Sequence, residues 1–180
     1  PQSIQEIATG AGKTIITATL SKLCEPYGRT VIIVPNKSLV TQTEEDYKNI
    51  GVDVGVYYGD RKQLNRTHTI CTWQSLNILD KKHKDGEAIL SLAEFLDGVS
   101  TVIVDEVHHA QSKSIQKIMN KMLICPDRVG LTGTLQDTKT HELVLKGLFG
   151  PVSKVISTKE LIDRSQVSDL EVRVLTLQYK

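Results

Sequence analysis

The stretch Ala8-Thr9-Gly10-Ala11-Gly12-Lys13-Thr14 decides how this sequence folds. Two closely spaced glycines followed by lysine and threonine are typical of a loop that cradles phosphate groups with backbone N–H groups. The strict pattern would place glycine at position 7, where the chain has Ile7. The flanks nevertheless support the loop, because residues 3–7 alternate as a strand does and residues 14–24 place apolar side chains on one side of a helix.

A pair of acidic residues, Asp105 and Glu106, follows the apolar run Val102-Ile103-Val104. A nucleoside triphosphate with Mg²⁺ needs a lysine for the phosphates, a hydroxyl and a carboxylate for the metal, and a second carboxylate for the attacking water. We therefore expect Lys13 to bind phosphate, Thr14 and Asp105 to bind Mg²⁺, and Glu106 to activate water. The alternative, a solvated acidic pair in a loop, has less support in a chain that also carries the phosphate loop. The residues predicted to bind ATP are Thr9, Gly10, Ala11, Gly12, Lys13 and Thr14.

Composition limits the classes of protein and partner to consider. The formal net charge of the 180 residues is only +1, so a basic surface for nucleic acid must be local. The three cysteines, Cys24, Cys71 and Cys125, are far apart and odd in number, which favours reduced thiols in a cytoplasm over disulfides or a zinc site. No apolar run approaches the length of a membrane span, so we expect no membrane partner.

Strand-like apolar runs alternate with helix-like segments along the chain. Strands are expected at residues 30–34, 52–57, 68–71, 101–104 and 128–131, and helices at 38–49, 73–79, 88–96, 112–122 and 140–148. This alternation predicts an α/β fold with a mostly parallel central sheet and helices on both faces. The charged stretch 81–86 is interpreted as a solvated loop, with a contact to a phosphate backbone as the alternative.

The carboxyl ends of the expected strands carry most of the unusual residues. In an open α/β sheet, ligands bind at this edge, because the strands end there and their loops converge. The segments that follow strands at this edge are residues 10–14, 35–38, 72–75, 105–108 and 132–134.

Five motifs in this order resemble the first RecA-like motor domain of superfamily 2 helicases and translocases. They lie at residues 8–14, 34–39, 71–76, 105–108 and 130–134, and the fourth is a DExH version of its motif. The resemblance covers almost the whole chain and is closest to the UvsW-type DNA helicases of tailed bacteriophages, with XPB-type helicases more distant. It implies a RecA-like P-loop NTPase domain that uses ATP and Mg²⁺ to act on DNA.

The resemblance also implies roles beyond the phosphate site. His108 is expected to join Lys13, Asp105 and Glu106 in the catalytic set by bonding to the 132–134 segment or the γ-phosphate side. Thr132, Gly133 and Thr134 are expected to couple the nucleotide state to the DNA, although Gly133 replaces the usual alanine and the two threonines offer the alternative of capping a turn.

A track for the nucleic-acid backbone is implied by the second and third motifs. Its predicted residues are Pro35, Asn36, Lys37, Thr72, Trp73, Gln74 and Ser75. Small polar side chains suit phosphate oxygens and offer little to distinguish bases. Trp73 has two open interpretations, stacking on a base or packing in the core. Arg61, Lys62 and Arg66 extend this track or, as the favoured interpretation, form solvated surface.

The expected organisation is a motor domain at residues 1–150 followed by a segment, 151–180, that leads toward a missing second RecA-like domain. That segment carries an expected helix at 158–163 and an alternating run at 170–177. We interpret the chain as part of a longer, monomeric helicase or translocase that remodels branched DNA or RNA–DNA hybrids in recombination and repair, in the host cytoplasm if phage-encoded. The alternatives are a restriction-system motor subunit, an RNA helicase of the same superfamily, and an ATP-binding regulatory module without catalysis.

Overall fold

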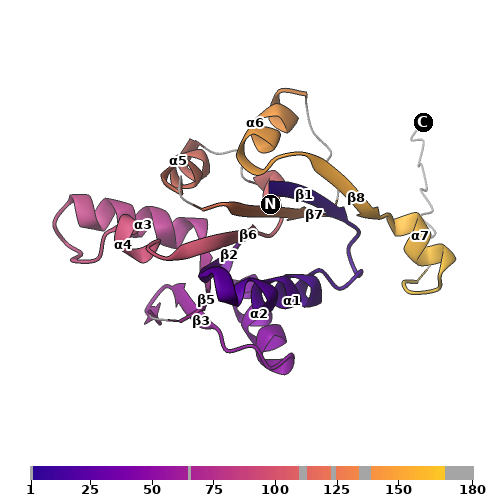
Figure 1. The fold of residues 1–180 in the computed structure, drawn as a ribbon, viewed down its shortest axis with the longest axis horizontal. Coiled ribbons are helices and arrows are strands. Elements are labelled where there is room, and N and C mark those ends of the chain that lie inside the picture. Colours follow the sequence, from indigo (N-terminus) through magenta and orange to yellow (C-terminus); the bar gives the residue numbers. More distant parts are fainter. Residues whose placement is uncertain (1, 65, 110–112, 123–124, 134–138, 169–180) are drawn as a thin grey trace, which may run out of the picture.

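The computed structural model describes residues 2–64, 66–109, 113–122, 125–133 and 139–168, which form an eight-stranded sheet with helices on both faces (Figure 1). The strand order is β4-β3-β5-β2-β6-β7-β1-β8. Every neighbouring pair is parallel except β3 and β4. The predicted α/β fold class with a mostly parallel sheet is therefore confirmed.

The elements follow one another in the expected alternation. The strands are β1 (Gln2–Ile7), β2 (Arg29–Val34), β3 (Gly55–Tyr58), β4 (Arg61–Lys62), β5 (His68–Thr72), β6 (Val99–Val104), β7 (Asp127–Thr132) and β8 (Val152–Ile156). The helices are α1 (Lys13–Cys24), α2 (Lys37–Asn49), α3 (Trp73–Lys84), α4 (Leu92–Phe95), α5 (Lys113–Lys121), α6 (Lys139–Phe149) and α7 (Thr158–Asp163), with short 3₁₀ turns at Glu25–Tyr27 and Val107–His109.

The central strands are buried on both faces, as their continuous apolar sequences predict. Along β2, Ile32 packs in a cluster with α1 and α2, whereas Val31 and Ile33 pack in a larger cluster with α3, α4, α5 and α6. Successive side chains of a strand point to opposite faces, so these two clusters lie on opposite sides of the sheet (Figure 1). Helices therefore cover both faces of the central strands.

Two helices differ from their predicted extents. α3 continues to Lys84, so the solvated loop expected at 81–86 is wrong over its first four residues. Asp80 on α3 pairs with Lys84 one turn later and with Lys117 and Lys121 on α5, which stabilises this end of the helix. α4 is shorter than expected because Ser91 and Glu94 form a capping box that starts the helix at residue 92.

The sheet also continues past residue 150, the expected limit of the motor domain. β8 pairs in parallel with β1 as the edge strand, and its mostly exposed side chains explain why no strand was predicted there. The helix expected at 158–163 is confirmed as α7, while the alternating run at 170–177 lies outside the described residues. All three cysteines are free. Within the described ranges, no helix combines the length and the apolar character needed to cross a bilayer.

Candidate functional site

The glycine loop between β1 and α1 has the backbone shape that its sequence predicts. Gly10 has a φ of 86° and Gly12 a φ of 78°, in the left-handed region that favours glycine. α1 begins at Lys13, and no side chain caps it because the N-cap residue is Gly12. An uncapped helix start with a partial positive charge is suited to bind an anion.

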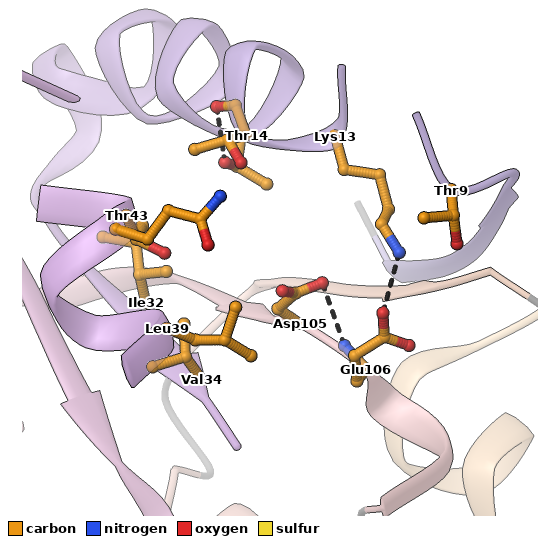
Figure 2. Close-up of a pocket in the computed structure, with 11 residues that line it drawn as sticks. Thr9, Lys13, Thr14, Ile32, Val34, Leu39, Thr43, Asp105 and Glu106 are labelled. Carbon is orange, nitrogen blue, oxygen red and sulfur yellow. Dashed lines mark hydrogen bonds and ion pairs between the residues drawn. The ribbon is translucent and has the colours of Figure 1, made fainter. Parts of the chain in front are cut away.

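Lys13 reaches across this loop to the acidic pair that follows β6. Its Nζ lies 2.8 Å from Glu106 Oε1, and both side chains are largely buried (Figure 2). The Asp105 N–H continues the ladder by donating to the carbonyl of Ile33, and Asp105 Oδ1 accepts from the Glu106 N–H at 3.0 Å. Glu106 has a φ of 49°, which costs about 1 kcal/mol in a residue other than glycine. This strained turn aims both carboxylates at the phosphate loop.

The electrostatics at Asp105 suit a bound cation. Burial raises the pKa of Asp105, and Lys13 opposes that rise while Glu106 adds to it. A metal ion here would favour the ionised carboxylate. The Thr14 hydroxyl and the Asp105 carboxylate are the hard oxygen ligands that Mg²⁺ prefers, with phosphates and water completing its shell. Among the described residues, no group of three or more His, Cys, Asp or Glu side chains forms a metal cage.

A cavity of about 220 Å³ opens beside Lys13 and Asp105, between the glycine loop and α2 (Figure 2). It is lined by Thr9, Lys13, Thr14, Thr17, Ile32, Val34, Leu39, Gln42, Thr43, Asp105 and Glu106. Gln42 and Thr43 were not predicted from the sequence as site residues. They are ordinary polar residues of an amphipathic helix, and only the placement of α2 beside the loop brings them to the cavity.

His108 connects the acidic pair to the end of β7. Its Nδ1 lies 3.0 Å from Thr132 Oγ1 and 3.4 Å from Glu106 Oε2, so the contact expected with the 132–134 segment is present. Gly133 lies against the phosphate loop, since a Cβ placed there would come within 3.1 Å of Thr9 Oγ1 and 3.8 Å of Lys13 Nζ. Thr134 lies outside the described residues.

The segment after β2 keeps its polar side chains near solvent. Asn36 caps α2, because its Oδ1 accepts from the Leu39 N–H at 3.1 Å. Lys37 is exposed, and its Nζ lies 5.7 Å from the centre of the Tyr58 ring. Pro35 is half-buried.

The segment after β5 is mostly buried, which changes how its residues are interpreted. Thr72 caps α3 through the Ser75 N–H, and the two hydroxyls lie 3.0 Å apart in the interior. Trp73 is 5% exposed and packs in the larger core cluster. Of its two interpretations, stacking on a base is wrong for this structure, because the ring is covered by core side chains. Gln74 is the exposed member of the segment.

Two of the basic residues near β4 pair with acidic side chains, and the third lies over an aromatic ring. Arg61 pairs with Glu44, and Arg66 pairs with Asp53. Lys62 Nζ lies 4.2 Å from the centre of the Tyr57 ring. Because each of these cations already has a partner, the structure favours the interpretation of Arg61, Lys62 and Arg66 as surface residues over an extension of the nucleic-acid track.

Comparisons with known proteins agree with this geometry. The family model for the res subunit of type III restriction enzymes matches residues 2–137. The chain is 29% identical to the ATP-dependent DNA helicase uvsW of Enterobacteria phage T4 over 98% of its own length and 35% of the relative's. It is 31% identical to the DNA 3'-5' translocase XPB2 of Sulfurisphaera tokodaii, over 86% of its own length and 32% of the relative's. The chain therefore spans about a third of the length of these curated relatives.

Solved structures show the same fold. The crystal structure of the UvsW helicase from bacteriophage T4 matches with a TM-score of 0.70 and 24% identity, covering 86% of this chain and 54% of that one. The helicase domain of Pyrococcus furiosus Hef matches with a TM-score of 0.68 and 18% identity, covering 86% of this chain and 34% of that one.

Proposed function

Since the chain belongs to the family described by the res subunit of type III restriction enzymes, we propose that it is the first RecA-like motor domain of an ATP-dependent DNA helicase or translocase. The observation that carries the proposal is the contact between Lys13 of the glycine loop and Glu106 of the acidic pair. Two segments far apart in the sequence thereby supply a phosphate-binding cation and a candidate base at one cavity. This is the division of labour that triphosphate hydrolysis requires.

Different residues of the chain have separate roles in the proposed hydrolysis of ATP. The backbone of residues 9–14 and Lys13 hold the phosphates, which requires Lys13 to leave Glu106. Glu106, released from that pair, accepts the proton of the attacking water. Thr14 and Asp105 would hold Mg²⁺, which supplies charge stabilisation to the transferring phosphoryl group. His108 bonds to Thr132 and so passes the state of the acidic pair to the end of β7.

The names of the relatives and the placement of exposed residues support a proposal for the substrate and partners. We infer that the protein remodels branched DNA or RNA–DNA hybrids in recombination and repair, and that it acts as a monomer in the cytoplasm of the host cell. The exposed residues Asn36, Lys37 and Gln74 would contact the nucleic-acid backbone. A second RecA-like domain would complete the motor, with Thr132, Gly133 and Thr134 coupling the two functions.

The description of the matched family favours a second candidate, the motor subunit of a restriction system. The described fold serves either protein, because both need a motor that moves along DNA without reading bases. A nuclease or target-recognition domain in the same full-length protein would favour the restriction motor.

Two substitutions test the proposed site. Lys13→Ala should weaken ATP binding sharply, because it removes the cation that faces the phosphates. Glu106→Gln should bind ATP at least as tightly as the wild type, because Lys13 loses its competing partner, and should lose hydrolysis. Binding is measured by calorimetry and turnover by phosphate release in the presence of branched DNA.

Lys22→Ala is the matched control, since Lys22 is exposed in the last turn of the same helix. It should leave both quantities unchanged. Equal turnover by the wild type and Glu106→Gln would overturn the assignment of the acidic pair.

A further inference from the structure

A second cavity, here called the hairpin cavity, lies between the β3–β4 hairpin, α3 and residues 87–90. Its volume is about 400 Å³. One wall consists of four residues on the same side of α3, which are Ser75, Ile78, Leu79 and Lys82. β4 lies at one end of the sheet, whereas β1, which leads into the glycine loop, is the neighbour of β8 at the other end (Figure 1). The hairpin cavity is therefore separate from the nucleotide site.

Exposed aliphatic side chains surround this cavity. Ile89 is 99% exposed, Ile78 is 54% exposed and Leu64 is 38% exposed. Grouped apolar side chains at a protein surface mark sites of interaction, because covering them removes apolar area from water. Since Ile89 projects fully into solvent, a small molecule held inside the cavity would leave it uncovered. The apolar surface therefore fits a chain segment that crosses the cavity and extends past its rim.

Two lysines stand among these aliphatic side chains, Lys62 from β4 and Lys82 from α3. In the part of the chain that the structure describes, no carboxylate pairs with either ammonium group, and Lys62 Nζ lies over the Tyr57 ring. Partial burial lowers the pKa of Lys62, and repulsion from Lys82 adds to this effect while Asp60 opposes it. A carboxylate bound between the two ammonium groups would relieve that repulsion.

The aromatic ring of this cavity is not accessible to nucleic-acid bases. Proteins that bind single strands without sequence preference stack the bases on aromatic side chains. Tyr57, the aromatic residue of the described lining, is only 5% exposed. Its ring packs against that of Phe95, with the two centroids 4.8 Å apart, and Lys62 covers it from solvent. The exposed walls are aliphatic, so they fit the apolar side chains of a peptide better than they fit bases.

We propose that the hairpin cavity docks a segment of a partner protein in which carboxylates alternate with apolar side chains. The apolar side chains would cover Ile89 and its neighbours, and the carboxylates would pair with Lys62 and Lys82. This inference goes beyond the proposed function, because the cavity lies at the far end of the sheet from the glycine loop. Glu87 also borders the cavity and is exposed. Its carboxylate repels an acidic segment, so its removal should strengthen binding.

Three short fluorescein-labelled peptides test which chemistry the cavity binds. The first alternates aspartate with leucine, the second has asparagine in place of aspartate, and the third has serine in place of leucine. Fluorescence anisotropy with the full-length protein should show the tightest binding for the first peptide, because it alone offers both charge and apolar surface. Equal affinities for the three peptides, or no binding of the first, would overturn the proposal.

Substitutions in the protein should change the affinity for the first peptide in both directions. Lys62→Gln combined with Lys82→Gln should weaken binding about tenfold, and Ile89→Ser should weaken it about fivefold. Glu87→Gln should tighten binding about twofold, because it removes a like charge. Thermal unfolding close to that of the wild type shows that each variant is folded. Wild-type affinity of the double lysine variant would contradict the assignment.

Lys22→Gln combined with Lys159→Gln is the matched control. It removes the same charge from exposed residues of α1 and α7 that do not line the cavity, so it should leave the affinity unchanged. Equal weakening by the control and by the pair Lys62 and Lys82 would reduce the effect to net charge and overturn the proposal. Displacement of the peptide by single-stranded DNA, together with weaker DNA binding by Ile89→Ser, would identify nucleic acid as the occupant and also overturn it.

Discussion

Glu44 is a buried carboxylate that the sequence does not distinguish from its exposed neighbours on α2. Its two oxygens accept from Arg61 at 2.7 and 2.8 Å, and one also accepts from Lys48 at 2.7 Å. The Arg61 guanidinium, assisted by Lys48, lowers the pKa of Glu44 to about 2 against the opposing effect of burial. Arg61, interpreted from the sequence as a solvated cation, therefore joins β4 to α2.

This pair makes the stability of the fold sensitive to acid. The folded pKa of Glu44 lies below its unfolded value, so its contribution is present above about pH 4.5 and is lost as the pH falls toward 2. Glu44→Gln should lower the free energy of unfolding by about 1–3 kcal/mol at pH 7, a range that allows for the partial exposure of Arg61. The difference from the wild type should shrink as the pH falls through that window.

Urea unfolding at pH 7 and at the lowest pH where the wild type stays folded measures both values. Glu45→Gln, at the exposed neighbouring position, is the control and should be close to neutral at both. A Glu44→Gln deficit that is independent of pH would show that the carboxylate charge is not the source of the stability.

The elements predicted best from the sequence are those whose side chains all share one environment or whose start is marked by a local motif. The second halves of β2 and β6 are continuous apolar runs because they are buried on both faces, and α7 begins with a local capping box at Ser157 and Glu160. β8 was missed because an edge strand needs no apolar pattern. The end of α3 was missed because Asp80 pairs there with Lys84 and with two lysines of α5, and the contact with α5 has no local signature.

The same distinction explains the predicted and missed parts of the site. Lys13, Asp105 and Glu106 stand in short motifs whose chemistry requires those residue types, so the sequence alone brought them to one rim. Gln42 reaches the cavity beside Lys13 only through the packing of α2. No spacing in the sequence relates it to the glycine loop.

β7 contains Gly130, whose close packing can be tested by comparison with Gly147 in α6. A Cβ at Gly130 would come within 2.9 Å of Val107 Cγ2, so the turn that carries His108 packs directly on this strand. Gly130→Ala should lower the free energy of unfolding by about 1–3 kcal/mol and reduce ATP turnover by displacing the acidic pair. Thermal unfolding and phosphate release measure the two effects.

Gly147, inside α6, is the matched control because a Cβ there meets nothing within 4 Å. Gly147→Ala should raise stability by about 0.5–1 kcal/mol through helix propensity. If both substitutions had the same sign, close packing at Gly130 would not be the cause.

Across the whole molecule, the carboxyl edge of the sheet separates the residues proposed to bind nucleotide from those proposed to bind nucleic acid. The phosphate loop follows β1, while the exposed residues Lys37 and Gln74 come after β2 and β5, which are neighbours in the sheet. β6 and β7 lie between these halves. Asp105 follows β6 and Thr132 ends β7, so the proposed coupling between nucleotide and nucleic acid would have a direct route along the sheet edge.

We expect the nucleic-acid backbone to bind at the half of this edge that carries Lys37 and Gln74. With a net charge of only +1, the affinity for DNA must come from a few local contacts. Lys37→Ala combined with Gln74→Ala should therefore weaken DNA binding about equally across sequences, because both side chains suit phosphates and not bases. Losing Lys37, the one formal charge of the two, should make the salt dependence shallower by about one unit of slope. Fluorescence anisotropy over a salt series measures affinity and slope together.

ATP binding without DNA should persist in the double variant. Lys22→Ala, at the far end of α1 from this edge, should change neither the DNA affinity nor its salt dependence. Selective loss of affinity for some sequences only, or normal binding by the double variant, would place the track elsewhere on the protein.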